Sequence, residues 1–154
     1  MPQSEYKYTL YKEYCLSLGK YDKRLLTIDS DRIVHEYYLD PRAEWIDIYD
    51  NGEPVGFLII CLSGGDCHPD ADYCIAQAFI LEEHRRKGLM FNTVSEFLQS
   101  HKGIYTLDVI QGNEQAEWFW DKVLEANNAE YIYLPEVRRE NICGNLNMRS
   151  FHIR

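Results

Sequence analysis

The chain has 154 residues, of which 45% are hydrophobic and 27% are charged, which is enough for one ordinary hydrophobic core. We therefore expect a single domain over residues 1–154. The net charge of -9 opposes nucleic-acid binding, which needs an excess of lysine and arginine on one face. No apolar run approaches the roughly 20 residues that cross a bilayer, and the N-terminus MPQSEYKY lacks the apolar stretch of a secretion signal. We expect a cytoplasmic protein without a membrane partner.

The negative charge is concentrated in one stretch. No lysine or arginine stands between Arg42 and Arg85, and nine acids do: Glu44, Asp47, Asp50, Glu53, Asp66, Asp70, Asp72, Glu82 and Glu83. These nine equal the whole net charge, because the other sixteen of the 25 acids balance the 16 bases. If the stretch borders a binding site, it favours a cationic partner. The alternative is a solvated acidic surface.

The cysteines indicate neither a disulfide framework nor a zinc site, because their number is odd and no two of them form a CxxC pair. They stand at positions 15, 61, 67, 74 and 143. The dipeptide Cys67-His68 would bind a metal only with ligands from elsewhere, and an ordinary reduced thiol is the favoured alternative. No metal cofactor is predicted.

The first forty residues allow two interpretations. Tyr6, Tyr8 and Leu10 alternate as in a strand, but a longer series suits one face of a helix: Tyr6, Leu10, Tyr11, Tyr14 and Leu18. Both interpretations stay open. A more helical segment near Ser30 to Tyr38 is ended by Asp40-Pro41.

From Trp45 onward the pattern is clearer. Trp45 to Tyr49 and Pro54 to Leu62 flank Asp50-Asn51-Gly52, and an Asn-Gly pair readily supplies the positive φ angles of a tight turn. The pattern predicts a β-hairpin. After a loop over 63–72, Tyr73 to Leu81 is typical of a further strand.

The second half alternates helices and strands. It predicts a helix from Gly88 to His101 with Met90, Val94, Phe97 and Leu98 on one face, a strand from Ile104 to Gln111, and a helix from the cap Asn113 to Ala126 that buries Ala116, Phe119, Trp120, Val123 and Leu124. Two strands follow, Tyr131 to Val137 and Leu146 to Ile153. The order indicates a mixed α+β domain.

A basic turn precedes the first of these helices. Arg85, Arg86 and Lys87 stand before Gly88, where the helix begins. The first N–H groups of a helix lack internal partners and lie at the positive end of its dipole, so that a phosphate can accept several of them. Glycine lets the backbone approach the phosphate, and the three cations add charge. The alternative is an ordinary solvated loop.

Two well-known phosphate loops do not fit, because the chain has neither GxxxxGK[ST] nor GxGxxG here. The segment Arg85 to Met90 instead resembles the pyrophosphate loop [RQ]xxGx[GA] of the GNAT superfamily of N-acetyltransferases. A second motif of that family, Asn-x-x-Ala-x-x-Φ-Tyr, appears as NEQAEWFW, Asn113 to Trp120. The resemblance covers roughly Trp45 to Val137.

The resemblance implies an α+β fold of the GNAT type. Its central sheet is mixed and mostly antiparallel, has about six or seven strands flanked by helices, and is splayed between its fourth and fifth strands. These correspond to Tyr73 to Leu81 and Ile104 to Gln111, and acetyl-CoA lies between them. The residues implied to bind it are Ala78, Phe79, Ile80, Arg85, Arg86, Lys87, Gly88, Leu89, Met90, Asn113 and Trp120.

The resemblance also implies a mechanism of direct attack without a covalent enzyme intermediate. The Ala78 amide faces the acetyl carbonyl and stabilises the oxyanion, while the Ile80 amide binds the pantetheine arm. Two positions depart from the family pattern. Met90 stands where glycine or alanine is preferred, and Trp120 replaces a tyrosine that commonly protonates the leaving thiolate. With Trp120 there, that proton must come from elsewhere.

A base must take a proton from the incoming ammonium group. Some family members place a glutamate on the strand at the position of Cys74, which is a poor substitute and is more often a small buried residue than an acyl-accepting thiol. Asp72, at the start of the same strand, is the first candidate, and its alternative is a carboxylate at a loop end. His84 is expected to contact solvent or phosphate.

Three functional hypotheses follow. The first is an acetyl-CoA-dependent N-acetyltransferase that acts on a primary amine of a small-molecule or peptide acceptor, cationic because of the acid-only stretch. The second is a non-catalytic module that binds or senses acyl-CoA, which Trp120 favours. The third, acetylation of charged tRNA, is disfavoured by the acidity. A homodimer is left open.

Overall fold

The structure is a computed structural model that describes residues 5–63, 70–132, 140–141 and 144–154. The dipeptide Cys67-His68 and most of the strand predicted from Tyr131 to Val137 lie outside the described residues. In the part of the chain that is described, none of the helices combines the length and the apolar composition that a membrane crossing requires.

The N-terminal forty residues are helical. They form α1 (Glu5–Leu18), the short 3-10 helix η1 (Lys23–Leu26) and α2 (Ser30–Leu39). The helical interpretation is therefore confirmed and the strand alternative is wrong. The buried residues of α1 are Leu10, Tyr11 and Cys15. A helix brings residues at this spacing to one side, and a strand does not.

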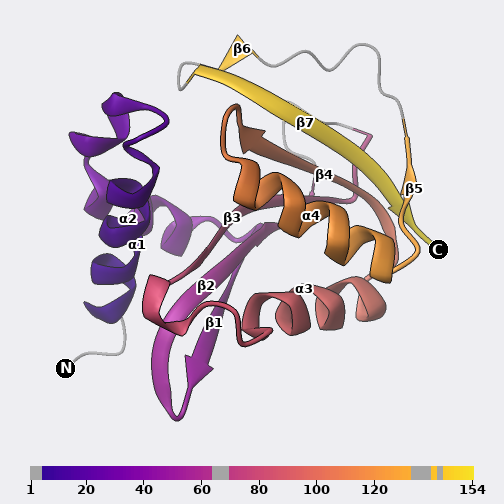
Figure 1. The fold of residues 1–154 in the computed structure, drawn as a ribbon, viewed down its shortest axis with the longest axis horizontal. Coiled ribbons are helices and arrows are strands. Elements are labelled where there is room, and N and C mark those ends of the chain that lie inside the picture. The colour runs from indigo at the N-terminus through magenta and orange to yellow at the C-terminus, as the bar shows by residue number, and fades with distance from the viewer. Residues whose placement is uncertain (1–4, 64–69, 133–139, 142–143) are drawn as a thin grey trace.

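A mixed sheet forms the centre of the molecule (Figure 1). Its strands are β1 (Ala43–Asp50), β2 (Glu53–Cys61), β3 (Tyr73–Ile80), β4 (Gly103–Ile110), β5 (Glu130–Tyr131), β6 (Glu140–Asn141) and β7 (Gly144–Ile153). The order is β1-β2-β3-β4-β7-β5, and β6 pairs with β7. Among the described strands the one parallel pair is β3 and β4. The predicted mixed, mostly antiparallel sheet is confirmed.

The predicted hairpin joins β1 and β2. Its turn residues Asn51 and Gly52 have φ angles of 52° and 82°, which are the positive values that the Asn-Gly pair predicts. The turn brings Asp50 and Glu53 opposite each other at the ends of the two strands. Asp50 therefore stands at the tip of the hairpin.

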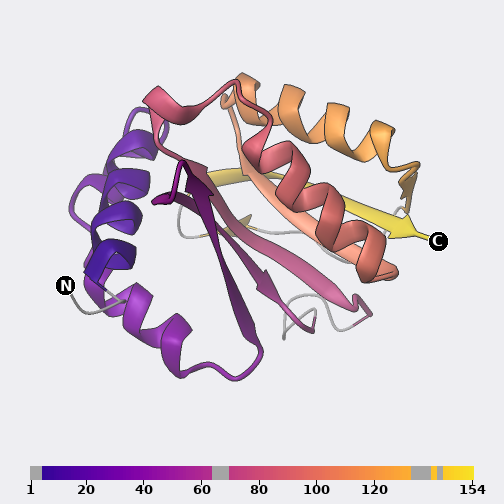
Figure 2. The ribbon, with the colours of Figure 1, turned by 90° about the horizontal axis from the view of Figure 1, so that it is seen from below.

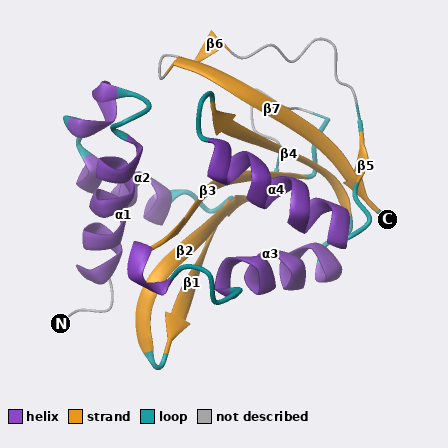
Figure 3. Cartoon of the chain, viewed as in Figure 1, coloured by secondary structure: helices purple, strands orange, loops and turns teal. Residues whose placement is uncertain are grey.

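Helices cover both faces of the sheet. Between β3 and β4 the chain forms the 3-10 helix η2 (Glu82–His84) and α3 (Leu89–Ser100), and α4 (Glu114–Ala126) follows β4. Figure 2 shows the sheet between α1 and α2 on one side and α3 and α4 on the other. Figure 3 shows the loop that leads from η2 into α3. Helices α3 and α4 agree with the predicted order, and the 3-10 helix η2 was not predicted.

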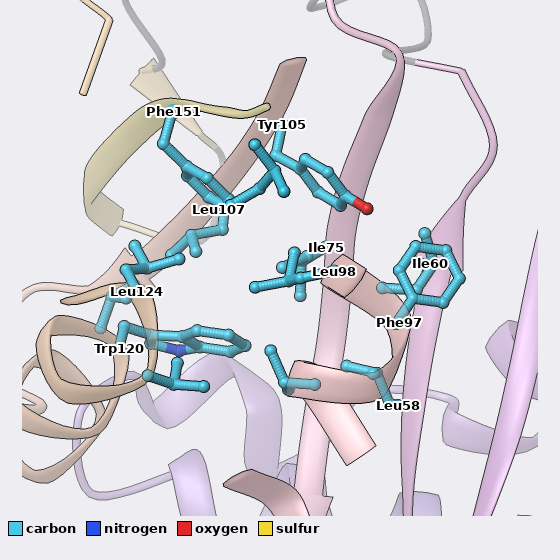
Figure 4. Close-up of a cluster of buried hydrophobic side chains, with 14 residues drawn as sticks. Leu58, Ile60, Ile75, Phe97, Leu98, Tyr105, Leu107, Trp120, Leu124 and Phe151 are labelled. Atoms are coloured by element: carbon cyan, nitrogen blue, oxygen red, sulfur yellow. The ribbon is translucent and has the colours of Figure 1, made fainter. Parts of the chain in front are cut away.

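The two faces of the sheet carry different cores. On the α3/α4 side, Phe97, Leu98, Trp120 and Leu124 pack against inward residues of β2, β3, β4 and β7 (Figure 4). We call this the α3/α4 core. On the other side, α1 and α2 pack on Phe57, Ile59 and Phe79 through an aromatic cluster that includes Tyr11, Tyr14, Tyr37 and Trp45. We call this the α1/α2 core.

Candidate functional site

The sheet opens between its two parallel strands. Within the described strands, β3 pairs with β4 only from Tyr73 to Ile75, against Tyr105 to Leu107, although both strands continue beyond these residues. The two strands therefore separate toward their carboxyl ends (Figure 1). Beyond Ile75 the main-chain groups on one side of β3 still face β2, and those on the other side face this opening instead of β4. We call the opening the splay.

A β-bulge lies in β3 where the splay begins. Ile59 of β2 pairs with Gln77, while the next residue, Ile60, pairs with Ile75, so that Ala76 is the extra residue. The bulge puts Ala76 in the α1/α2 core next to Gln77, whose side chain bonds Tyr14 of α1. A bulge re-aims the groups that follow it, as the predicted site requires.

The amides of Ala78 and Ile80 point into the splay. Leu81 N donates to Val55 O over 2.9 Å, so Leu81 faces β2. Main-chain groups alternate in direction along an antiparallel strand, and Ala78 and Ile80 therefore face away from β2. The side chain of Arg85 supports this direction, since its Nε donates to Ile80 O over 2.8 Å.

Helix α3 begins without a side-chain cap. Its N-cap is Gly88, with φ of 78°, and among the described residues no side chain caps its first N–H groups. By contrast, Asp29 caps α2 and Asn113 caps α4. The first N–H groups of α3 are thus suited to an external anion. Space does not explain this glycine, because an added Cβ would meet only Asn92 Nδ2 at 3.8 Å. The requirement is its left-handed backbone, which other residues rarely adopt.

The three cations of the loop have different surroundings. Arg85 lies with its guanidinium 5.6 Å from the centre of the Phe79 ring, in addition to its bond to Ile80 O. Lys87 Nζ lies 2.6 Å from Asp50 Oδ2 at the hairpin tip. Arg86 is exposed and has a φ of 66°, a conformation that is uncommon outside glycine and often found at ligand sites.

Asp50 joins the hairpin tip to this loop. Its Oδ2 also lies 2.9 Å from His84 Nδ1. The bonds from Lys87 and then from His84 hold the pKa of Asp50 below its usual value. His84 thus contacts a carboxylate, which its sequence position did not predict.

The chain matches a family model in most of its length. Residues 8–125 match the Acetyltransferase (GNAT) family. The chain belongs to this family. None of the curated protein sequences matches it.

Solved structures share the GNAT fold of this chain. An acetyltransferase from Thermus thermophilus is 21% identical, with a TM-score of 0.58 over 79% of this chain and 71% of its own. Diaminobutyrate acetyltransferase EctA from Paenibacillus lautus, in complex with L-2,4-diaminobutyric acid and coenzyme A, is 14% identical, with a TM-score of 0.64 over 95% and 89%. A GNAT acetyltransferase from Elizabethkingia anophelis with acetyl-CoA bound is 12% identical, with a TM-score of 0.55 over 83% and 86%.

Both departures from the GNAT motifs lie against the core. Trp120 is 6% exposed and its ring lies in the α3/α4 core (Figure 4). Met90 packs against the same core, turned inward as the helical face predicts. Trp118, two residues before Trp120 in α4, is by contrast 65% exposed and lies outside the core. Asn113 caps α4 through its bond to Ala116 N, so its side chain positions the helix.

Asp72 lies at the other end of β3 from the splay. Its Oδ2 accepts from Ile104 N over 2.8 Å, and its own amide donates to Ile104 O over 2.8 Å. From Asp72 to Ala78 an extended strand covers about 20 Å. The geometry thus favours the alternative of a loop-end carboxylate, and the structure does not bring Asp72 to the Ala78 amide.

Two polar residues near the splay were not predicted from the sequence. Gln77 Oε1 accepts from the Tyr14 hydroxyl, and Gln77 Nε2 donates to the Tyr37 hydroxyl over 3.3 Å. Burial raises the pKa of both tyrosines. Asp108 is the first β4 residue after the last pair with β3. The available signal was a single carboxylate inside the otherwise uncharged strand GIYTLDVI.

Proposed function

We propose that this GNAT protein moves the acetyl group of acetyl-CoA to a primary amine of a small-molecule or peptide acceptor by direct attack. The observation that carries the proposal is the combination of the uncapped α3 N-terminus with the splay into which the Ala78 and Ile80 amides point. The first suits a pyrophosphate and the second suits a pantetheine arm and a thioester carbonyl. Similar structures that contain acetyl-CoA or coenzyme A support this choice of donor.

In the proposed complex, the first turn of α3 holds the pyrophosphate and exposed Arg86 adds charge beside it. Arg85 acts mainly by holding Ile80 O, and thereby orients the adjoining amide. Lys87 shares its charge with Asp50. The Ala78 amide faces the acetyl oxygen and stabilises the negative charge that develops there as the amine attacks.

The acceptor is proposed to be cationic because the stretch between Arg42 and Arg85, which includes β3 at the edge of the splay, contains acids and no lysine or arginine. Of the nine acids between Arg42 and Arg85, the structure describes eight, and Asp50 among them is paired with Lys87. Such a surface raises the local concentration of ammonium compounds. One similar structure contains L-2,4-diaminobutyric acid, an amine, which is consistent with this class.

A second candidate function is a module that binds acyl-CoA without turnover. Trp120 favours it, because an indole N–H is too weak an acid to protonate a thiolate and the side chain lies in the core. The two functions differ in one measurement. Steady release of thiol from acetyl-CoA with any member of a panel of diamines, aminoglycosides, amino acids and peptides supports the enzyme. Submicromolar binding without release across the panel supports the module.

The donor site is tested by a pair of glycine substitutions. Gly88→Glu places bulk and negative charge at the first turn of α3, and we expect the Kd for acetyl-CoA in calorimetry to rise by at least 100-fold. Gly52→Glu is the matched control, because Gly52 has a similar φ of 82°, nothing within 4 Å of an added Cβ, and a place in the hairpin turn. Equal affinities of the two variants would refute the pyrophosphate site.

A further inference from the structure

Polar side chains gather on the face of the sheet that is turned away from the α3/α4 core, beside the splay. Cys74, Thr106 and Ser150 are register partners across β3, β4 and β7. Partners in a sheet share a face, and the next residue along each of these strands belongs to the α3/α4 core. The three residues therefore form a row on the opposite face, which we call the polar row.

Two hydroxyls of the polar row have no hydrogen-bond partner among the described residues. The Oγ1 atom of Thr106, which is 0% exposed, and the Oγ atom of Ser150, which is 6% exposed, are both buried. A buried hydroxyl without a partner is destabilising, and native proteins usually supply a water or a ligand to such groups. The polar row thus points to a bound polar group that is not part of the described chain.

Asp108 extends the polar row to the splay. It follows Thr106 by two residues in β4, so it lies on the same face at a distance of about 7 Å along the strand. It is also the first residue beyond the last β3–β4 pair, Ile75 with Leu107, and its Oδ1 atom is buried. Asp108 therefore stands where the splay begins, on the strand that faces the bulge at Ala76.

We propose that Asp108 binds the ammonium group of the acceptor and takes its proton, and that the hydroxyls of Thr106 and Ser150 bind a second polar group of the same acceptor. This assignment rests on the proposed acetyl transfer. It favours primary amines that carry a further hydrogen-bonding group over simple alkylamines. It also supplies the carboxylate that Asp72, at the far end of β3, does not provide.

The chemistry balances with this one base. The ammonium group gives a proton to Asp108, and the neutral amine attacks the thioester carbon, forming the C–N bond. The resulting oxyanion faces the Ala78 amide. When it collapses, the C–S bond breaks and the thiolate leaves with the second proton of the amine nitrogen. Asp108 then releases its proton to solvent, so that one amide, one thiol and one proton are formed.

The kinetic test is the variant Asp108→Asn, measured with saturating acetyl-CoA and the best amine of the panel. We expect kcat/KM for the amine to fall by about 100-fold at pH 7, the usual size of a lost general base. The loss should shrink as the pH approaches the pKa of the amine, because neutral amine is then abundant. The KM for acetyl-CoA should not change. Glu96→Gln, on the exposed side of α3, is the control. A wild-type pH profile in Asp108→Asn would overturn the proposal.

Thr106→Val separates ligand binding from a structural role. Valine keeps the shape of threonine and removes the hydroxyl. If the hydroxyl serves the acceptor, the KM for the amine rises by about tenfold, in line with the loss of one hydrogen bond, while the Tm is unchanged or higher. A lower Tm together with an unchanged KM for the amine would assign the hydroxyl to the fold and overturn its proposed role.

A binding measurement keeps the inference distinct from the proposed function. With protein labelled with ¹³C at the aspartate carboxyl groups, addition of the amine panel in the presence of CoA is expected to shift the Asp108 resonance and leave that of Asp72 in place. If wild-type protein turns over no amine, the proposed transfer fails. A shifted Asp108 resonance would then still support the amine site, and an unshifted one would overturn it.

Discussion

The side chain of Asp72 belongs to the paired end of β3. Its carboxylate accepts from the Ile104 amide, thirty-two residues away in the sequence, and so fixes the start of β4. Lys87 is likewise bonded to Asp50, thirty-seven residues away. Partners of this kind depend on how distant segments meet, so a local pattern of residue types does not predict them. A local pattern does predict the role of Gly88 at the start of α3, because its left-handed φ is a property of the local backbone.

Replacement of Asp72 tests this structural role. In Asp72→Ala the Ile104 amide loses its acceptor, and we expect the free energy of unfolding to fall by about 1–3 kcal/mol. Denaturation with urea measures this change. Turnover per folded molecule at neutral pH should stay close to that of the wild type. A large loss of kcat with unchanged stability would instead return Asp72 to the role of base.

Most elements after Trp45 could be predicted from the sequence, because each has a local cause. Asn51-Gly52 makes the hairpin turn, Asn113 caps α4, and buried residues recur with helical spacing in α3 and α4. The bulge at Ala76 was not located by the pattern, since it depends on the register between β2 and β3. The splay itself was expected only through the family resemblance.

Helix α4 is tied to β7 through one arginine. The Arg149 guanidinium bonds the carboxylates of Glu117 and Asp121, and its side chain is only 13% exposed. Asn147 adds a bond to Glu117 over 3.0 Å. These contacts join the helix to the strand that flanks β4, and so support one wall of the splay.

Arg149→Met should therefore weaken the fold. It leaves two acids of α4 without their cation, and we expect the free energy of unfolding to drop by about 2 kcal/mol. Arg32→Met, which breaks an ion pair with Glu36 in which both side chains are more than 60% exposed, should cost about 0.5 kcal/mol. Chemical denaturation of the two variants measures both values, and equal losses would contradict the role of Arg149.

At the scale of the whole molecule, charge and fold act together. The acid-only stretch covers the hairpin and β3, of which β3 borders the splay, and the net charge is -9. A cationic acceptor would be drawn to this side by long-range attraction, which salt screens over about 8–10 Å at ordinary ionic strength. In the proposed complex, the anionic acetyl-CoA instead depends on the N–H donors at the α3 N-terminus.

The salt dependence of turnover follows from this arrangement. With acetyl-CoA held at saturation, kcat/KM for a dicationic amine should fall about five- to tenfold between 20 mM and 500 mM salt, the direction that electrostatic steering requires. An amine with one charge should respond less. If both amines gave the same dependence, the acidic stretch would be only a solvated surface.

The proposed donor site is tested most directly by amide NMR of ¹⁵N-labelled protein titrated with acetyl-CoA. We predict that the largest shifts occur at Leu89, Met90 and Phe91 in the first turn of α3, and at Ala78 and Ile80 in the splay. Binding that leaves these five amides unshifted, and moves resonances elsewhere, would contradict both the pyrophosphate site and the transfer that depends on it.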